Sequence, residues 1–173
     1  MKRVIVLGSA GSGKSTLTQK LSEILKLPVI HLDKYYWKPN WEPTSNEEWD
    51  EVVRGFTMKE QWIIDGNYSR TLDIRIQRAD LIIYLDMPTS LCIYRVLKRR
   101  LMYHKKSRPD MNEECPEKLD WEFFRWVWNY RKRSRMKTIN KLESVRTQKQ
   151  IIIVKSRKEV FDLINRLEQS NEI

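Results

Sequence analysis

Residues 8–15 read Gly8-Ser9-Ala10-Gly11-Ser12-Gly13-Lys14-Ser15, and this stretch decides the fold. It matches the phosphate-binding pattern G-x-x-x-x-G-K-[ST] at every fixed position. The apolar, β-branched run at 2–7 predicts a buried parallel strand, and residues 14–25 place leucine and isoleucine at helical spacing. A strand, a glycine-rich turn and a helix form the context in which this motif binds the phosphates of a nucleotide.

The residue types of the loop fit that chemistry. Glycine permits the dihedrals that turn successive backbone N–H groups inward at the positive end of a helix. Lys14 would then reach the β- and γ-phosphates, and the Ser15 hydroxyl would ligate Mg²⁺. We therefore predict ATP and Mg²⁺ as cofactors. The predicted nucleotide-binding residues of the loop and the first helical turn are Gly8, Gly11, Ser12, Gly13, Lys14, Ser15 and Thr16.

The length of 173 residues suits one domain with a sizeable core. No apolar run approaches the ~18 residues of a membrane span, and no signal-peptide pattern begins the chain, so we expect a soluble, cytoplasmic protein without a membrane partner. Cys92 and Cys115 fit no metal-ligand spacing and should be free thiols. The sequence predicts no oligomeric state.

Two acidic residues follow predicted strands at the sheet edge that holds the phosphate loop. Asp33 ends the strand 28–32, and Asp65 ends the strand 61–64. Open parallel sheets bind ligands beyond the carboxyl ends of their strands, so both carboxylates are predicted to contact substrate. Asp33 would be a general base for an acceptor hydroxyl or a water-linked Mg²⁺ residue, and Asp65 would hold a water on Mg²⁺. Either residue could instead be a simple turn residue. Arg70, in the next loop, would bind a substrate phosphate or carboxylate with its fork.

Residues 34–44 are dense in aromatic residues and turn formers, and a helix signal follows, with Ser45 and Glu48 set as a capping box. We interpret about 34–60 as an acceptor-side insertion. Its rings, Tyr36 among them, either stack on the acceptor or pack the insertion onto the body of the domain.

The net charge of +10 is concentrated in two clusters, at 95–108 and 131–137. This distribution favours a phosphate clamp for a small polyanionic substrate over nucleic acid or an anionic membrane. Arg95 and Arg99 share a helix face, which indicates either an anionic ligand or a solvated face. Arg157 opens the terminal helix, and the loop before it is a candidate contact to the nucleotide base.

The rest of the chain continues the alternation of strands and helices. Strands are predicted at 79–86 and 151–154, and helices begin near 89, 117 and 155, the second of them reaching about 148. Residues 104–116 lack apolar periodicity and are predicted to form a mobile loop.

This order of elements resembles the P-loop kinases of the adenylate kinase-like group. The phosphate loop, the run from Asp65-Gly66 to Arg70-Thr71, and the basic run at 95–100 carry the resemblance. It implies an α/β domain over 1–173, with a five-stranded parallel sheet in the order 2-3-1-4-5, flanking helices and a helical lid at about 101–135. By the same resemblance, Arg70 would bind an acceptor phosphate, and Arg99, Arg131 and Arg135 would bind the transferring phosphates.

The chain departs from the adenylate kinase pattern on the acceptor side. Asn67-Tyr68-Ser69 lengthen the run between Gly66 and Arg70 and remove its proline. The run from His31 to Tyr36 with Lys38-Pro39 instead resembles uridine and nicotinamide riboside kinases, in which the corresponding aspartate acts on a hydroxyl. Nearly the full length is similar to the bacterial topology modulation proteins, whose label suggests an effect on DNA supercoiling.

The sequence therefore predicts an ATP-dependent kinase acting on a small nucleotide, nucleoside or related acceptor. The predicted catalytic residues are Lys14, Asp33, Arg99, Arg131 and Arg135. An ATP-binding, nucleic-acid-associated regulator of DNA topology is the alternative, but the chain contains no familiar nucleic-acid-binding motif. An NTPase without an acceptor is a third reading. Whether the acceptor is a hydroxyl or a phosphate is left open.

Overall fold

The computed structural model describes residues 1–103, 109–112, 114–116 and 121–171. Five parallel strands form the central sheet in the order β2-β5-β1-β6-β7. Counted along the chain within this sheet, that order is 2-3-1-4-5, as predicted. The strands are β1 (Arg3–Gly8), β2 (Val29–His31), β5 (Trp62–Asp65), β6 (Leu81–Leu85) and β7 (Gln150–Val154).

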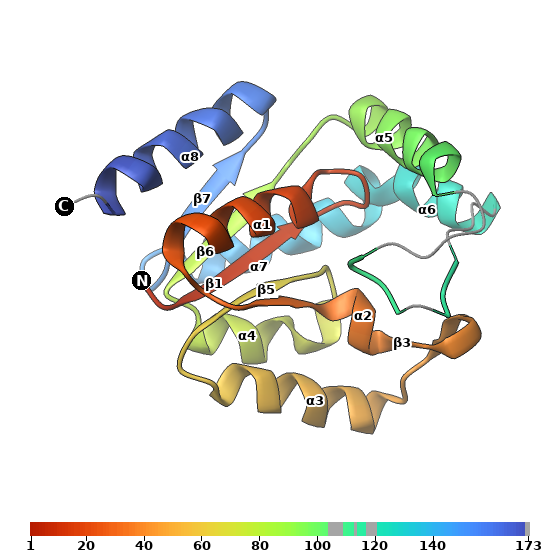
Figure 1. Ribbon diagram of the computed structural model, residues 1–173, viewed down its shortest axis with the longest axis horizontal. Coiled ribbons are helices and arrows are strands. Elements are labelled where there is room, and N and C mark those ends of the chain that lie inside the picture. The colour runs from red at the N-terminus through yellow and green to blue at the C-terminus, as the bar shows by residue number, and fades with distance from the viewer. Residues whose placement is uncertain (104–108, 113, 117–120, 172–173) are drawn as a thin grey trace.

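Helices cover both faces of this sheet (Figure 1). One face is covered by α1 (Lys14–Leu25), α5 (Thr89–Met102), α6 (Trp121–Tyr130) and α8 (Arg157–Asn171). The other face is covered by α3 (Asn46–Met58), α4 (Leu72–Arg78) and α7 (Met136–Ser144). The result is a three-layer α/β/α arrangement. No helix within the described ranges is both long enough and apolar enough to cross a bilayer.

The strands are buried from both sides, which explains their continuous apolar sequences. In β1, Val4 and Val6 face the core under α1, whereas Ile5 and Leu7 face the core over α3 and α4, and all four are fully buried. Val4 pairs in register with Ile63 of β5 on one side and Leu81 of β6 on the other. The strand before the phosphate loop is thus the centre of the sheet.

The insertion after β2 is built from short elements. It comprises α2 (Leu32–Tyr36), a hairpin of β3 (Trp37–Lys38) and β4 (Glu42–Pro43), and then α3. Asp33 therefore lies in the first turn of α2 rather than in an open turn after the strand. Ser45 caps α3 as predicted, accepting the Glu48 N–H at 3.3 Å, while the Glu48 carboxylate bonds Lys38 instead of completing the capping box.

The predicted helix 117–148 consists of α6, a π-helical turn over Arg131–Arg135, and α7. Residues 117–120 of this prediction lie outside the described residues, as do 104–108 and 113 of the predicted loop 104–116. Those ranges include Lys105, Lys106 and Arg108 of the first basic cluster.

Candidate active site

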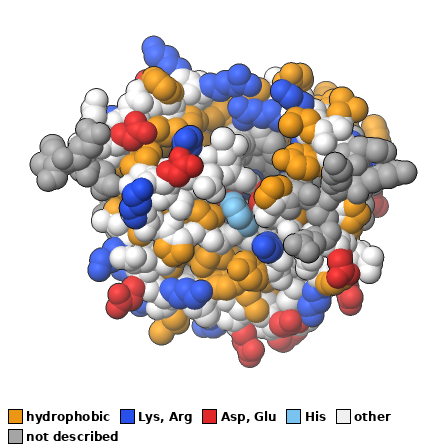
Figure 2. Space-filling model, in the orientation of Figure 1, with side chains coloured by type: hydrophobic (Ala, Val, Ile, Leu, Met, Phe, Trp, Pro, Cys, Tyr) orange, Lys and Arg blue, Asp and Glu red, His pale blue; other side chains and the backbone are white. Residues whose placement is uncertain are grey.

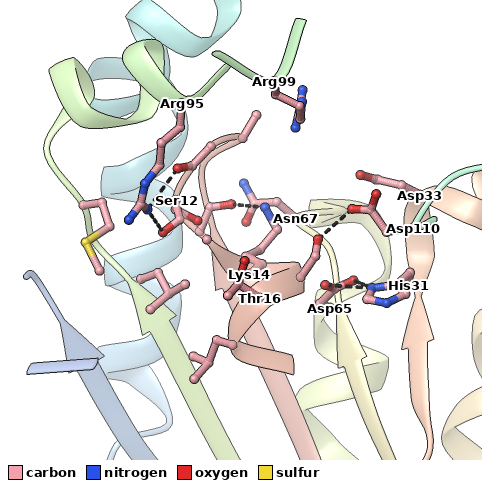
Figure 3. Close-up of a pocket in the computed structure, with 18 of the residues that line it drawn as sticks. Ser12, Lys14, Thr16, His31, Asp33, Asp65, Asn67, Arg95, Arg99 and Asp110 are labelled. Atoms are coloured by element: carbon pink, nitrogen blue, oxygen red, sulfur yellow. Dashed lines mark hydrogen bonds and ion pairs between the residues drawn. The ribbon is translucent and has the colours of Figure 1, made fainter. Parts of the chain in front are cut away.

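A cavity of about 1360 Å³ opens beyond the carboxyl ends of β1, β2 and β5. Figure 2 shows a hollow near the centre of this face, with hydrophobic and charged side chains around it. In Figure 3, Ser12 and Arg95 lie on one side of this site, and Asp33, Asp110, His31 and Asp65 lie on the other. The cavity therefore joins the phosphate loop to the strand-end carboxylates.

The phosphate loop is folded tightly against α5. Gly11 has φ 74°, and a Cβ added there would overlap the Cys92 carbonyl of α5. Gly13, at the N-cap of α1, has φ 104°, so both positions adopt backbone that glycine accommodates readily. The Lys14 ammonium donates to the carbonyl oxygens of Gly8 at 3.0 Å and Ser9 at 3.1 Å.

Two hydroxyl groups of the loop indicate what it binds. The Oγ atoms of Ser9 and Ser12 are buried without a hydrogen-bond partner in the described part of the chain. Buried hydroxyls are normally satisfied, so their position in a loop at the N-terminus of α1 fits a phosphate ligand. The residues present therefore fit a bound nucleoside triphosphate.

Arginines from α5 and α8 border the loop. Arg95 donates through Nη1 to the carbonyl oxygens of Ser12 at 2.8 Å and Gly11 at 3.3 Å. Burial, together with the nearby charge of Arg157, lowers the pKa of Arg95 below its ordinary value. Arg95, Arg99 and Arg157 all line the cavity, so three of the predicted cations lie where a nucleotide would be.

Ser15 meets a carboxylate from the segment after α5. Its hydroxyl donates to Oδ2 of Asp110 at 2.6 Å, and both residues line the cavity. Asp65 lies deeper, where it is buried and accepts from Thr18 at 3.4 Å. Hydroxyl and carboxylate oxygens are the ligands that Mg²⁺ prefers. The described residues contain no group of three or more His, Cys, Asp or Glu side chains that could hold a metal ion.

His31 is paired with Asp65 across the neighbouring strands β2 and β5. Its Nδ1 lies 3.0 Å from Oδ2 and 3.1 Å from Oδ1 of Asp65, and the two residues are register partners. Burial opposes protonation of the imidazole, but the hydrogen bond to Asp65 and the charges of Asp65, Asp110 and Asp33 raise the pKa of His31 above 6.5.

Asp33 reaches the same cavity from α2. The Tyr68 hydroxyl donates to Oδ1 of Asp33 at 2.7 Å. Asn67, beside it, donates through Nδ2 to the Tyr130 hydroxyl at 3.0 Å and also lines the cavity. The three residues that interrupt the adenylate kinase pattern, Asn67, Tyr68 and Ser69, therefore all line the cavity.

Several predicted site residues lie elsewhere. The described lining of the cavity does not include Tyr36, Arg70, Arg131 or Arg135. Arg70 forms a two-bond ion pair with Asp50 of α3, with distances of 2.9 and 2.8 Å. Arg135 forms one with Asp86, with both distances 2.7 Å. Arg131 is exposed, and Tyr36 packs among the rings of Trp37, Trp49 and Tyr68.

Among the polar residues that line the cavity, sequence reasoning gave no role to His31, Asn67, Tyr68 or Asp110. Asn67 and Tyr68 had a usable signal, because they stand where the adenylate kinase pattern is broken. His31 had a weaker one, since it ends a strand next to that of Asp65. Asp110 had none, because nothing local links it to Ser15, 95 positions away.

Two curated relatives match part of the chain. An uncharacterized protein, YqaC, of Bacillus subtilis (strain 168) is 32% identical over 104 residues, which is 57% of this chain and 56% of that protein. A probable chloroplastic adenylate kinase 2 of Oryza sativa subsp. japonica is 31% identical over 85 residues, or 43% of this chain and 29% of that protein. The chain thus spans about half or less of the length of these relatives.

Solved structures match over nearly the whole chain. Shikimate kinase from Acinetobacter baumannii, solved in complex with shikimate, has a TM-score of 0.57 at 16% identity, covering 98% of this chain and 92% of that one. A gluconokinase from Sinorhizobium meliloti 1021 has a TM-score of 0.51 at 15% identity, covering 98% and 94%. At these identities the likeness shows the fold, which is that of the P-loop kinases.

The family comparison covers the site itself. Residues 4–120 match the family described as AAA domain, and this range contains the phosphate loop, His31, Asp33, Asp65 and Arg95. The match extends over more than half of the chain. The chain therefore belongs to the AAA domain family, with a P-loop kinase-like architecture.

Proposed function

We propose that this protein is an ATP-dependent kinase that transfers the γ-phosphoryl group to a hydroxyl group of a small molecule. The observation that carries the proposal is that Asp33 and the phosphate loop line one cavity. Arg70, which an acceptor phosphate would require by analogy with adenylate kinases, is instead bound to Asp50. Because Arg70 is engaged elsewhere, the cavity suits a hydroxyl acceptor better than a phosphate acceptor. A hydroxyl acceptor must lose a proton, which the Asp33 carboxylate can accept.

The nucleotide side of the cavity would hold the triphosphate. Backbone N–H groups of the loop, with Lys14, would bind the β- and γ-phosphates, and Arg95 and Arg157 would border the nucleotide. Ser15, with Asp65 nearby, would hold Mg²⁺, which would supply positive charge to the phosphoryl transfer. Arg99 of α5, which lines the same cavity, would add positive charge to that site.

The acceptor side would supply the base. Asp33 takes the hydroxyl proton as the acceptor oxygen bonds to the γ-phosphorus and the bond to the β–γ bridging oxygen breaks, leaving ADP. The rings of Trp37, Trp41 and Trp126 line the cavity and would help to exclude water from it. We propose residues 101–135 as the lid that closes over both ligands, and the arginines Arg131 and Arg135 as residues of that lid.

The test measures acceptor-dependent release of ADP from Mg·ATP with a panel of sugars, nucleosides, cyclic polyols and their phosphorylated forms. We expect turnover with a hydroxyl compound, and a fall in kcat of about 10²-fold or more in Asp33→Asn. Lys14→Ala should lower kcat/KM by a similar factor. Lys59→Ala, an exposed residue after α3, is the control and should retain full activity.

Two results would contradict this function. Turnover confined to phosphorylated acceptors and unaffected by Asp33→Asn would exclude transfer to a hydroxyl. ADP release that no acceptor stimulates would identify an NTPase instead.

A further inference from the structure

Tyr68 makes the shortest described side-chain contact to Asp33. Its hydroxyl donates to Oδ1 at 2.7 Å. Burial of the ring and the negative charge of Asp33 raise the pKa of Tyr68 above its ordinary value. The phenol therefore keeps its proton throughout the neutral range and acts as a donor to the carboxylate.

The Tyr68 ring is held on two sides by other rings. Its centroid lies 4.6 Å from that of Tyr36 and 4.9 Å from that of Trp49, and both contacts are tilted. Trp49 is 1% exposed and packs in the core beneath the insertion. The phenol thus has little freedom to leave Asp33, because a shift of the ring would open a void in packed side chains.

A fully buried arginine fixes the backbone beneath that ring. Arg75 of α4 donates to the carbonyl oxygens of Tyr68 at 2.6 Å, Gly66 at 2.9 Å and Thr71 at 3.3 Å. Desolvation lowers the pKa of Arg75 to about 10, so the guanidinium is still charged at neutral pH. One cation therefore ties the loop after β5 to α4.

We propose that Tyr68 is a positioning residue, which holds Oδ1 of Asp33 so that Oδ2 faces the acceptor hydroxyl. In the described part of the chain Oδ2 has no protein partner, whereas Oδ1 has Tyr68. The inference rests on the proposed function, in which the acceptor proton passes to Asp33. That proton moves to Oδ2 as the new O–P bond forms and the bond to ADP breaks, and Tyr68 keeps its own proton.

The arrangement gives a role to Tyr68 within the run Asn67-Tyr68-Ser69 after β5. A carboxylate on the short helix α2 is otherwise free to rotate, and a base works best when its accepting oxygen is already aimed. The tyrosine is the only side chain from the described residues 66–71 that contacts Asp33. Tyr68, one of the residues that break the adenylate kinase pattern, would therefore serve the acceptor chemistry through Asp33.

The test compares Tyr68→Phe with Tyr35→Phe, which removes a hydroxyl from α2, the helix that carries Asp33, at a half-exposed site outside the cavity lining. With Mg·ATP and the panel compound that gives the highest turnover, we expect Tyr68→Phe to lower kcat about 10- to 100-fold. The KM for ATP should change less than about twofold, because the phosphate loop is untouched. Tyr35→Phe should behave as wild type.

A double-mutant cycle separates positioning from mere support of the fold. In an Asp33→Asn background, adding Tyr68→Phe should cause no further loss, since the two residues act through one carboxylate. An equal loss in both backgrounds, or no loss in Tyr68→Phe alone, would overturn the inference. Full activity of Asp33→Asn alone would contradict the proposed function, whereas a loss in Asp33→Asn without a loss in Tyr68→Phe would contradict only the positioning role.

A crystal structure of Tyr68→Phe supplies a readout that does not depend on turnover. The Asp33 carboxylate should lose its single orientation or rotate away from the cavity, with the fold otherwise unchanged. An Asp33 carboxylate that keeps its wild-type orientation without the tyrosine hydroxyl would refute the positioning role.

Discussion

At the scale of single residues, the site depends on the hydrogen-bond partner of each carboxylate. Asp110 accepts from Ser15, Asp33 from Tyr68, and Asp65 faces His31. Only the last of these pairs contains a group that changes charge near neutral pH. The His31–Asp65 pair should therefore make folding stability depend on pH.

His31→Gln keeps a neutral donor but removes the charge, and the free energy of unfolding without Mg²⁺ is the quantity to measure. Because the folded pKa of His31 is raised, its contribution is fully present below the unfolded pKa and disappears as pH rises through the folded pKa. We expect wild type to exceed His31→Gln by on the order of 1 kcal/mol near pH 5.5 and by little near pH 9. A difference that grows with pH would contradict the pairing. In an Asp65→Asn background, His31→Gln should change the free energy of unfolding by about the same amount at both pH values.

At the scale of elements, the loop between β5 and α4 is set by one buried side chain. Arg75 bonds three carbonyl oxygens of that loop, and no carboxylate among the described residues bonds it. Its role is to satisfy backbone acceptors that would otherwise be buried without donors. The 66–71 loop therefore keeps its shape even though it has few backbone bonds of its own.

Arg75→Met preserves much of the side-chain volume but leaves those acceptors unsatisfied. We expect it to lower the free energy of unfolding by about 3 kcal/mol, measured by urea denaturation. Arg78→Met, on the same helix but exposed and with a single 3.4 Å bond to the Thr57 carbonyl, is the matched control and should change stability by less than about 1 kcal/mol. Equal effects of the two substitutions would show that the buried guanidinium does not organise the loop.

At the scale of the whole molecule, the acceptor-side hairpin and the segment after α5 close over the cavity together. Trp41 donates through Nε1 to the Pro116 carbonyl at 3.1 Å, and the Asn40 N–H donates to the Glu114 carbonyl at 3.1 Å. The Cys115 thiol donates to the Lys38 carbonyl at 3.2 Å. Two parts of the chain more than 70 residues apart thus meet at the rim of the site.

A ligand that binds only the folded protein raises its melting temperature by an amount that grows with the logarithm of the ratio of ligand concentration to Kd. A non-hydrolysable ATP analogue with Mg²⁺, at about 100 times its Kd, should add about 2.7 kcal/mol. For a chain of this size that is a rise in Tm of roughly 5 to 10 °C in calorimetry. Lys14→Ala should abolish most of this rise, and Lys59→Ala should retain it. An unchanged rise in Lys14→Ala would remove the phosphate loop from nucleotide binding.

Most of the fold could be predicted because it follows from local pattern. The buried strand, glycine-rich turn and amphipathic helix at 2–25 are each legible in sequence, and short crossover connections leave few orders for the strands. The β3–β4 hairpin was missed, because its turn uses Asn40 and Trp41 at φ 61° and 65° rather than glycine. Nothing in the composition of 34–44 distinguishes such a turn from an irregular loop.

The site could be predicted only where sheet topology brings residues together. Asp33 and Asp65 follow neighbouring parallel strands, so their convergence was foreseeable. Arg70 and Arg135 were assigned to phosphates by the resemblance to adenylate kinases, and nothing in their local sequence revealed other partners. Asp50 and Asp86, which bind them, are 20 and 49 positions away. Ion pairs between distant residues are decided by tertiary packing, which residue spacing does not reveal.

The distribution of the seven tryptophans gives the molecule its own optical reporter. Trp37, Trp41 and Trp126 border the cavity, whereas Trp49 and Trp62 are almost completely buried in the core opposite α1. Indole emission shifts when its surroundings change from water to ligand or protein, and buried indoles contribute a constant background. Occupancy of the cavity can therefore be followed by intrinsic fluorescence in real time, without a label and before any acceptor has been identified.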